Sequence, residues 1–392
     1  GMVDTLMLSA VGDYAVGAVG TANSYIGIFI IMFSIISSGM VSVMTQNIGA
    51  GRPGVAYQAR QLGLLFNAVA GVLMAVFLFS GAGAILRMVG IADALYEPAL
   101  IYLKIVGGGC ILNAVIPIFS SYLRAFGYTK QPLYATIVGN IANFVMNAVF
   151  LFVLHKGVAG VAAATVISKI LNLCIVLYFS HKLISAKNST ERIANKTVLG
   201  QIVKVGLPSA CETALYNVAM MLVIRFLNQM DAEGLNVTAR SYTATISNFS
   251  YCVGAALAQA NAIMTGWHIG AGELEECDRG TKRAAFVGVC VAVCMETAIV
   301  LGSGFIMPLF TDNPEMTALV RKLLAIDIVL EIGRVTNLVF GQALKTSGDA
   351  VFPAVIAAVF MFVFAVGGTW LFGISMGLMA VGAYIGLARS EE

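Results

Sequence analysis

Long apolar runs recur along the chain at intervals that suit membrane-spanning helices. Residues 25–44 read YIGIFIIMFSIISSGMVSVM, and residues 286–307 read FVGVCVAVCMETAIVLGSGFIM. A helix needs about 20 such residues to cross the hydrocarbon core of a bilayer. Unpaired backbone groups are not tolerated there, which leaves helices or a closed barrel. The length of the runs favours helices.

Clusters of glycine, proline and charge divide the chain into two similar sets of spans. The pattern predicts an all-α polytopic membrane protein with twelve transmembrane helices, in two six-helix lobes. We expect an N-lobe at 1–182, a cytoplasmic linker at 183–198 and a C-lobe at 199–392, with the first and last helices incomplete. The predicted spans lie near 1–9, 20–46, 56–80, 97–124, 132–154 and 157–182, and then near 199–228, 238–266, 281–308, 316–345, 351–373 and 377–392.

The two halves share landmarks at a constant spacing. The tetrapeptide IGAG occurs at Ile48 and again at Ile269, which lies 221 positions later (269 minus 48). Gly127 and Gly348 have the same spacing, and so do Pro132 and Pro353. Agreement in register over so long a stretch indicates an internal repeat.

An even number of spans in each half predicts a parallel repeat, with both copies inserted in the same orientation. Basic residues such as Arg52, Arg124, Lys196 and Lys345 gather in alternate connections, while the other connections are mainly acidic. By the positive-inside rule, the basic connections are cytoplasmic. We therefore expect a multi-pass protein of the bacterial inner membrane, with its N-terminus and central linker in the cytoplasm.

Composition supports this class and argues against others. Apolar residues make up 59% of the 392 residues and charged residues 11%, with a mean hydropathy of +0.89. The formal net charge of +3 is small, and the basic residues are dispersed, so nucleic acid is not an expected partner. Seven cysteines without a C-x-x-C pair suit packing better than metal binding. We expect neither an enzyme nor a cofactor.

The stretch QNIGAGRPG contains Gly49, Gly51 and Gly54 and so matches the glycine pattern of a dinucleotide-binding turn. That fingerprint needs a preceding strand and a surrounding βαβ unit. Here a predicted span precedes it, and the second copy, GAGELE, lacks the third glycine. We interpret the motif as a tight connection between two helices.

Several motifs together resemble those of the multidrug and toxic compound extrusion (MATE) family. They are MVDTLMLSAVG, QNIGAGRPGVAYQAR, LRAFGYTKQP, NIANFVMNAVFLF followed by GVAGVAAATVIS, and VGLPSACETALYN. The resemblance is collinear over essentially the whole chain. It implies a two-lobed secondary antiporter that exports amphipathic, often cationic compounds in exchange for Na⁺ or H⁺.

Ionisable residues within the spans provide candidates for such a role, because a charge in the bilayer persists mainly where it lines a cavity or has a partner. Asp4 lies in the first apolar stretch. A buried carboxylate can exchange a proton or bind Na⁺ near neutral pH, and Asp4 matches the acidic residue that the family uses for cation coupling. The alternative is a structural carboxylate at a helix end.

Asn143 and Asn147 lie on one helix face by spacing, and such amides can simply join helices. In one bacterial branch of the family an Asn and an Asp occupy these positions, with a Thr in the next helix that matches Thr165. The resemblance thus adds Asn143, Asn147 and Thr165 to the coupling set. Asn147 cannot titrate, although its amide oxygen can bind Na⁺.

The second half contains its own candidates for a substrate cavity. Glu212 follows Pro208 by four residues, and another branch of the family has a carboxylate nearer Tyr216. Glu331 and Arg334 share a helix face, so they form either an internal ion pair or part of the cavity lining. Glu296 and Asp327 are further buried acids without a counterpart in the family pattern.

Two alternatives to an antiporter remain. One is a lipid-linked oligosaccharide flippase of the same superfamily, whose cavity should be rich in Arg and Lys, whereas the intramembrane charges of this sequence are mostly acidic. The other is a non-transporting membrane receptor or assembly protein. The partners that we expect are a small amphipathic or cationic substrate and membrane lipid, with the protein as a monomer.

Overall fold

The structure, a computed structural model, describes residues 7–8, 13–88, 91, 93–184, 191–230, 235–309, 311 and 313–391. These residues form helices and connecting turns, with no strand among them, which confirms the predicted all-α polytopic fold. Seven helices in the described ranges are long and apolar enough to cross a membrane, or eight if one bent pair is a single span. The long helices α9 and α11 fall outside this set because polar residues occur through their middle sections.

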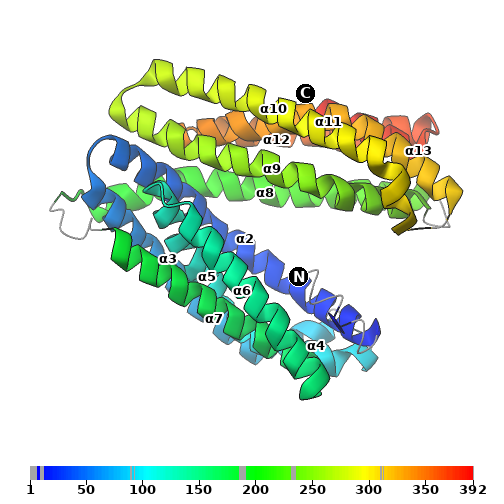
Figure 1. Cartoon of the computed structure of the whole chain (residues 1–392), viewed down its shortest axis with the longest axis horizontal. Helices are drawn as coiled ribbons and strands as arrows, with labels where there is room; N and C mark the ends of the chain where they lie inside the picture. The colour runs from blue at the N-terminus through cyan, green and yellow to red at the C-terminus, as the bar shows by residue number, and fades with distance from the viewer. Residues whose placement is uncertain are drawn as a thin grey trace. The chain divides into compact units, whose positions relative to one another are not determined.

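Contacts divide the chain into an N-terminal unit, Gly1–Gly206, and a C-terminal unit, Leu207–Glu392. Helix α8 (Asn195–Met230) begins in the first unit and continues into the second. Figure 1 shows the helices of both units. The N-terminal unit contains α2 (Asp13–Gly49), α3 (Pro53–Met88), α4 (Asp93–Gly108), α5 (Cys110–Ala125), α6 (Lys130–Ala148), the π-helix η1 (Val149–Val153) and α7 (Gly157–Leu183). The C-terminal unit contains α9 (Leu235–Ala271), α10 (Leu274–Ile306), η3 (Met307–Leu309), α11 (Pro314–Ser347), α12 (Val351–Phe360), the π-helices η4 (Met361–Val366) and η5 (Thr369–Ser375), and α13 (Met379–Glu391).

The internal repeat of 221 residues is visible in where the helices begin. Helices α3 and α10 start at Pro53 and Leu274, and α4 and α11 start at Asp93 and Pro314. Helices α6 and α12 start at Lys130 and Val351. Each pair is 221 positions apart, so the two units are built from the same succession of helices.

The turns of the repeat also have the same geometry in both copies. Gly51 and Gly272 adopt φ values of 73° and 80°, in the left-handed region that glycine enters at little cost. The following N–H groups, of Arg52 and Glu273, each donate to a carbonyl five residues earlier, at 2.8 Å in both copies. This is the Schellman type of helix C-cap. The IGAG motif therefore ends a helix, as expected, and the same pattern recurs at Gly127 and Gly348, with φ values of 84° and 102°.

One predicted span differs between the two copies. The span expected at 97–124 consists of two helices, α4 and α5, that meet at Gly109 with a bend of 40°. Three consecutive glycines, Gly107 to Gly109, occupy this point, whereas the second copy has Ile328, Val329 and Leu330 in the unbroken helix α11. Glycine weakens a helix interior because it loses the most backbone freedom on folding.

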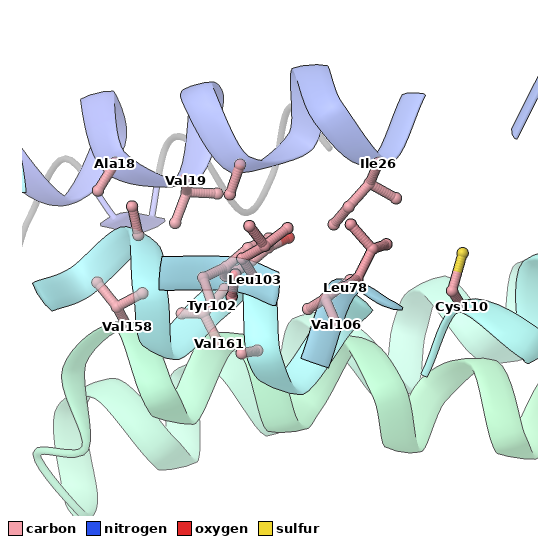
Figure 2. Close-up of a cluster of buried hydrophobic side chains, with 14 of the residues drawn as sticks. Ala18, Val19, Ile26, Leu78, Tyr102, Leu103, Val106, Cys110, Val158 and Val161 are labelled. Atoms are coloured by element: carbon pink, nitrogen blue, oxygen red, sulfur yellow. The ribbon is translucent and has the colours of Figure 1, made fainter. Parts of the chain in front are cut away.

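Two hydrophobic clusters of described residues lie in the N-terminal unit, and Figure 2 shows one of them. Figure 2 shows side chains from α2, α3, α4, α5 and α7 in this cluster, among them Ile26, Val106 and Cys110. Asn67 on α3 is a buried polar side chain that donates to the carbonyls of Phe33 on α2, at 3.2 Å, and Ala114 on α5, at 3.0 Å. Asn67 thereby joins three helices.

In the C-terminal unit, the equivalent contact between helices is packed in a different way. The positions of Asn67 and Ala114 correspond to Gly288 on α10 and Val335 on α11. A Cβ atom on Gly288 would lie 2.8 Å from Cγ1 of Val335, and one on Gly254 of α9 would lie 2.8 Å from Cγ2 of the same residue. Two glycines thus give Val335 room, which allows α9, α10 and α11 to approach closely. Helices α9 and α10 run antiparallel through this region (Figure 1).

Candidate functional site

Three carboxyl side chains converge in the C-terminal unit. Glu296 on α10 and Asp327 and Glu331 on α11 each offer an oxygen within 4.8 Å of the other two. We call these three residues the carboxylate cluster. Asp327 and Glu331 are one turn apart and so share a face of α11, and α10 packs against that helix. The three residues are 0%, 2% and 0% exposed, respectively.

Arg334, one turn further along α11, is the cation that pairs with the carboxylate cluster. Its Nη1 lies 2.6 Å from Oε2 of Glu331, and its Nη2 lies 3.9 Å from Oδ1 of Asp327. A planar guanidinium suits such a buried pairing because it spreads its charge over several donors. Helix α9 adds two buried hydroxyl groups, with Ser250 beside Glu296 and Glu331, and Ser247 beside Asp327.

A cavity of about 530 Å³ adjoins the cluster. Helices α8, α9, α11 and α13 contribute to its lining, together with Ala357 and Met361 from the α12 region. Asp327 and Arg334 belong to the lining, whereas Glu296 and Glu331 do not. The carboxylate cluster therefore reaches the cavity through Asp327.

A second ion pair lies in the same lining. Nζ of Lys345 on α11 is 2.9 Å from Oε1 and 2.8 Å from Oε2 of Glu212 on α8. Arg240 on α9 also lines the cavity, and its Nη2 donates to Sδ of Met220 at 3.4 Å. Among the described residues, three basic and two acidic side chains line the cavity: Arg240, Arg334, Lys345, Glu212 and Asp327.

The residues predicted to form the substrate cavity do not all lie in it. Glu212, Tyr216 and Arg334 line the cavity. Glu331 is fully buried and pairs with Arg334 behind the lining. Of the two alternatives that the sequence left open for Glu331, the internal ion pair agrees with this geometry.

The expectation of mostly acidic intramembrane charges also fails at this cavity. Arg240 and Lys345 were not counted among the buried charges of the second half, yet both line the cavity. In the N-terminal unit, Lys169 on α7 is a further basic residue within a span, and its Nζ donates to Oδ1 of Asn113 on α5 at 2.8 Å. A search of the apolar runs for every charged residue, basic as well as acidic, would have found all three.

The predicted coupling residues of the N-terminal unit are only partly brought together. Nδ2 of Asn147 donates to Oδ1 of Asn143 at 3.3 Å, one turn away on α6. Helix α6 packs against α7, where the Thr165 hydroxyl donates to the carbonyl of Val161 in its own helix, at 2.9 Å. Asp4 lies outside the described residues.

Comparison with known proteins identifies relatives over the whole chain. The MatE family model matches residues 1–149 and 208–384. A protein of Bacillus subtilis (strain 168), described as the uncharacterized transporter YisQ, is 32% identical over 397 residues. The match covers 100% of this chain and 87% of that relative.

Solved structures with the same fold cover 100% of this chain. One is described as the outward-facing conformation of a multidrug resistance MATE family transporter of the MOP superfamily, with a TM-score of 0.89, 19% identity and 87% of its length covered. A MATE structure in the bent conformation gives a TM-score of 0.90 at 18% identity, again with 87% covered. A MOP superfamily transporter from Pyrococcus furiosus, described as having a binding pocket of reverse polarity, gives 0.86 at 19% identity, with 88% covered.

Proposed function

The chain belongs to the MATE family of membrane transporters, and on that premise we propose that it is a secondary antiporter, not an enzyme, that exports amphipathic organic compounds, cationic ones among them, in exchange for Na⁺ or H⁺. Export proceeds by alternating access of a substrate cavity. The protein acts as a monomer in a bacterial inner membrane, with its N-terminus and central linker in the cytoplasm.

The observation that supports this proposal best is the charged cavity in the C-terminal unit. Charged side chains within membrane spans are costly and persist mainly where they line a cavity or have a partner. Here Glu212 pairs with Lys345, and Asp327 lies beside Arg334, around a space of about 530 Å³. Such a space accepts a drug-sized molecule, and its charged groups provide contacts for the polar end of an amphipathic compound.

The coupling ion binds in the N-terminal half in this proposal. Asp4 is its carboxylate ligand, and Asn143, Asn147 and Thr165 supply neutral oxygens nearby. The hydrogen bond between Asn147 and Asn143 holds the two amides on one face of α6. Because neutral amides and a hydroxyl cannot change charge, Asp4 is the group on which coupling depends.

The test is efflux of a fluorescent organic cation from vesicles that contain the purified protein, under separately imposed Na⁺ and pH gradients. We expect efflux to speed up when one of the two gradients is imposed, and to be slow without a gradient. Efflux that responds to neither gradient would contradict antiport. Binding of the dye without any flux would instead support a receptor or assembly protein.

A flippase for lipids with an anionic headgroup is the second candidate, and the cavity charges favour it specifically. Arg240, Arg334 and Lys345 all line the space, and arginine suits phosphate recognition because of its fork of donors. The test is translocation of a fluorescent pyrophosphate-linked lipid across the same vesicles. Translocation of this lipid without dye efflux would favour the flippase.

A further inference from the structure

We propose that the carboxylate cluster is a proton-binding site, in which Glu296 carries an exchangeable proton that it shares with Asp327 and Glu331. The inference rests on the proposed function in one respect, because it gives the antiporter a second titratable site, separate from Asp4. It names a residue, Glu296 on α10, that the proposed coupling set does not contain. Four observations lead to it.

The first observation is the balance of charge. The cluster contains three carboxyl groups, and among the described residues Arg334 is the cation within ion-pair distance of two of them, Asp327 and Glu331. If all three acids were ionised, two negative charges would remain uncompensated among side chains that are at most 2% exposed. Burying uncompensated charge in a medium of low dielectric constant is strongly unfavourable. The folded protein therefore has to hold additional positive charge at this point.

The second observation is a set of oxygens without hydrogen-bond donors. In the described part of the chain, both carboxyl oxygens of Glu296, Oδ2 of Asp327 and Oε1 of Glu331 have no hydrogen-bond partner of normal geometry, although the Ser247 and Ser250 hydroxyls lie beside these acids. The buried hydroxyl groups of Ser247 and Ser250 on α9 also have no partner of normal geometry. An ionised carboxylate can only accept, whereas a protonated one also donates. A proton on Glu296 supplies the donor that these acceptors need.

The third observation comes from the internal repeat, which provides a natural comparison. At the equivalent positions of the N-terminal unit, five of the six side chains are apolar and belong to or pack against the hydrophobic cluster in Figure 2, and the sixth, Asn113, accepts a hydrogen bond from Lys169. The fold can therefore fill this location with hydrocarbon, so the acids serve a purpose other than packing. Glu296, Asp327, Glu331 and Arg334 correspond to Ala75, Val106, Cys110 and Asn113, and Ser247 and Ser250 correspond to Ile26 and Phe29, each pair 221 positions apart.

The fourth observation is the route to the site. Asp327 and Ser247 line the cavity, whereas Glu296 is fully buried behind them. Oxygens of Asp327 and Glu296 lie within 4.8 Å of one another, so a proton from cavity water can reach Glu296 through Asp327. A metal ion would have to approach the guanidinium of Arg334, which already contacts Glu331 at 2.6 Å. The geometry thus favours a proton over Na⁺.

Among the residues that the structure describes, a few charged and titratable groups surround Glu296. Helix α11 contributes Asp327, Glu331 and Arg334, and helix α9 contributes the hydroxyl of Ser250. Tyr384 on α13 faces Asp327. Protonation and release at Glu296 therefore change the charge that Arg334 experiences from the cluster, and Arg334 belongs to the cavity lining.

Infrared difference spectroscopy of the purified full chain in lipid, between acidic and alkaline pH in Na⁺-free buffer, tests the proposal. We expect a protonated-carboxyl C=O band that vanishes as pH rises, and we expect Glu296→Gln to remove it. Glu276→Gln is the matched control, because Glu276 lies at the exposed start of the same helix and pairs with Arg279. A band that remains in Glu296→Gln, or one that Na⁺ removes at constant pH, would overturn the proposal.

Thermal unfolding provides a second readout that does not depend on transport. A buried acid that is neutral when folded and ionised when unfolded binds more protons in the folded state, so stability falls as pH rises. In Glu296→Gln, and in Glu296→Ala, which matches Ala75 of the other unit, the unfolding temperature should decrease much less as pH rises. If the unfolding temperature depended on pH equally in the unmodified protein and in both Glu296 variants, the proposal would also be overturned. Because both readouts are equilibrium measurements, a failure of ion-coupled efflux would contradict the proposed function alone.

Discussion

Lys345 on α11 donates to Glu212 on α8 at 2.9 Å, so a carboxylate that faces the cavity already has a cationic partner. The sequence predicts Glu212 only as a candidate residue of the substrate cavity, and the structure places it in the cavity lining. With Lys345 in place, an incoming cation has to compete with a charge-assisted hydrogen bond. This pair therefore sets how strongly the cavity attracts positive charge.

Removing the amine of Lys345 should strengthen the binding of organic cations. In Lys345→Met the Glu212 carboxylate loses its partner, and a hydrogen bond to a charged group is worth about 2 kcal/mol. We expect a cationic dye to bind the purified protein on the order of tenfold more tightly, measured by fluorescence titration. The double variant Lys345→Met with Glu212→Gln should lose this gain. Equal affinities in the single and double variants would show that Glu212 does not contact the dye.

Arg240 should determine how well the cavity accepts compounds with an acidic group. Among the described residues it forms no ion pair with a carboxylate, and it lines the cavity beside α8. Arg240→Gln should weaken the binding of a carboxylated dye by about tenfold, as expected for a charge-assisted contact worth about 1–2 kcal/mol. Cationic dyes should bind as before or more tightly. Arg225→Gln, on the exposed side of α8, is the control, and equal losses in both variants would contradict a role for Arg240.

Asp4 should be required for coupling in the N-terminal half. Asp4→Asn keeps the size and polarity of the side chain but removes the carboxylate, so we expect the response of dye efflux to the driving gradient to disappear. The measurement is efflux from vesicles with and without the gradient, in the full protein. Asn140→Asp provides a control, because Asn140 is exposed on α6. Gradient-driven efflux that survives in Asp4→Asn would exclude Asp4 as the coupling residue.

The close packing of Gly288 against Val335 should make this glycine sensitive to substitution. A methyl group on Gly288 would lie 2.8 Å from Cγ1 of Val335, and overpacking of this kind costs about 1–3 kcal/mol. We expect Gly288→Ala to lower the temperature of thermal unfolding, and Val335→Ala to restore much of it in the double variant. Gly280→Ala on the same helix meets no atom within 4 Å and should be neutral or stabilising. An unchanged unfolding temperature in Gly288→Ala would contradict this packing.

Much of the fold could be predicted from the sequence because its signals are local. Apolar runs of the right length predict the helices, and glycines predict the turns between them. Gly51, Gly127, Gly272 and Gly348 indeed adopt the left-handed backbone conformation that favours glycine. The repeat then relates one half to the other. The break at Gly109 was missed because a run of glycines in an apolar span weakens a helix without necessarily ending it.

The site was harder to predict because it depends on contacts between helices. Asp327 and Glu331 are recognisable as neighbours on one helix, but nothing in the sequence indicates that Glu296, on the preceding helix, faces them. Their mutual distance depends on the close approach of α10 and α11, which follows from Gly288 and Val335. The basic lining was missed for a simpler reason, since Arg240 and Lys345 lie near the ends of predicted spans, where a water-facing position is the usual expectation.

The matching left-handed glycines at the ends of the repeated helices bear on how the two halves diverged after a common ancestral unit was duplicated. Gly51 and Gly272, and Gly127 and Gly348, still reverse the chain in the same way, with the same hydrogen bonds. Interior positions between them differ in chemistry, as at Val106 in one half and Asp327 in the other. Because the turns have the same geometry, equivalent helices stay in register, so the two halves can hold different side chains at equivalent interior positions without a change of fold.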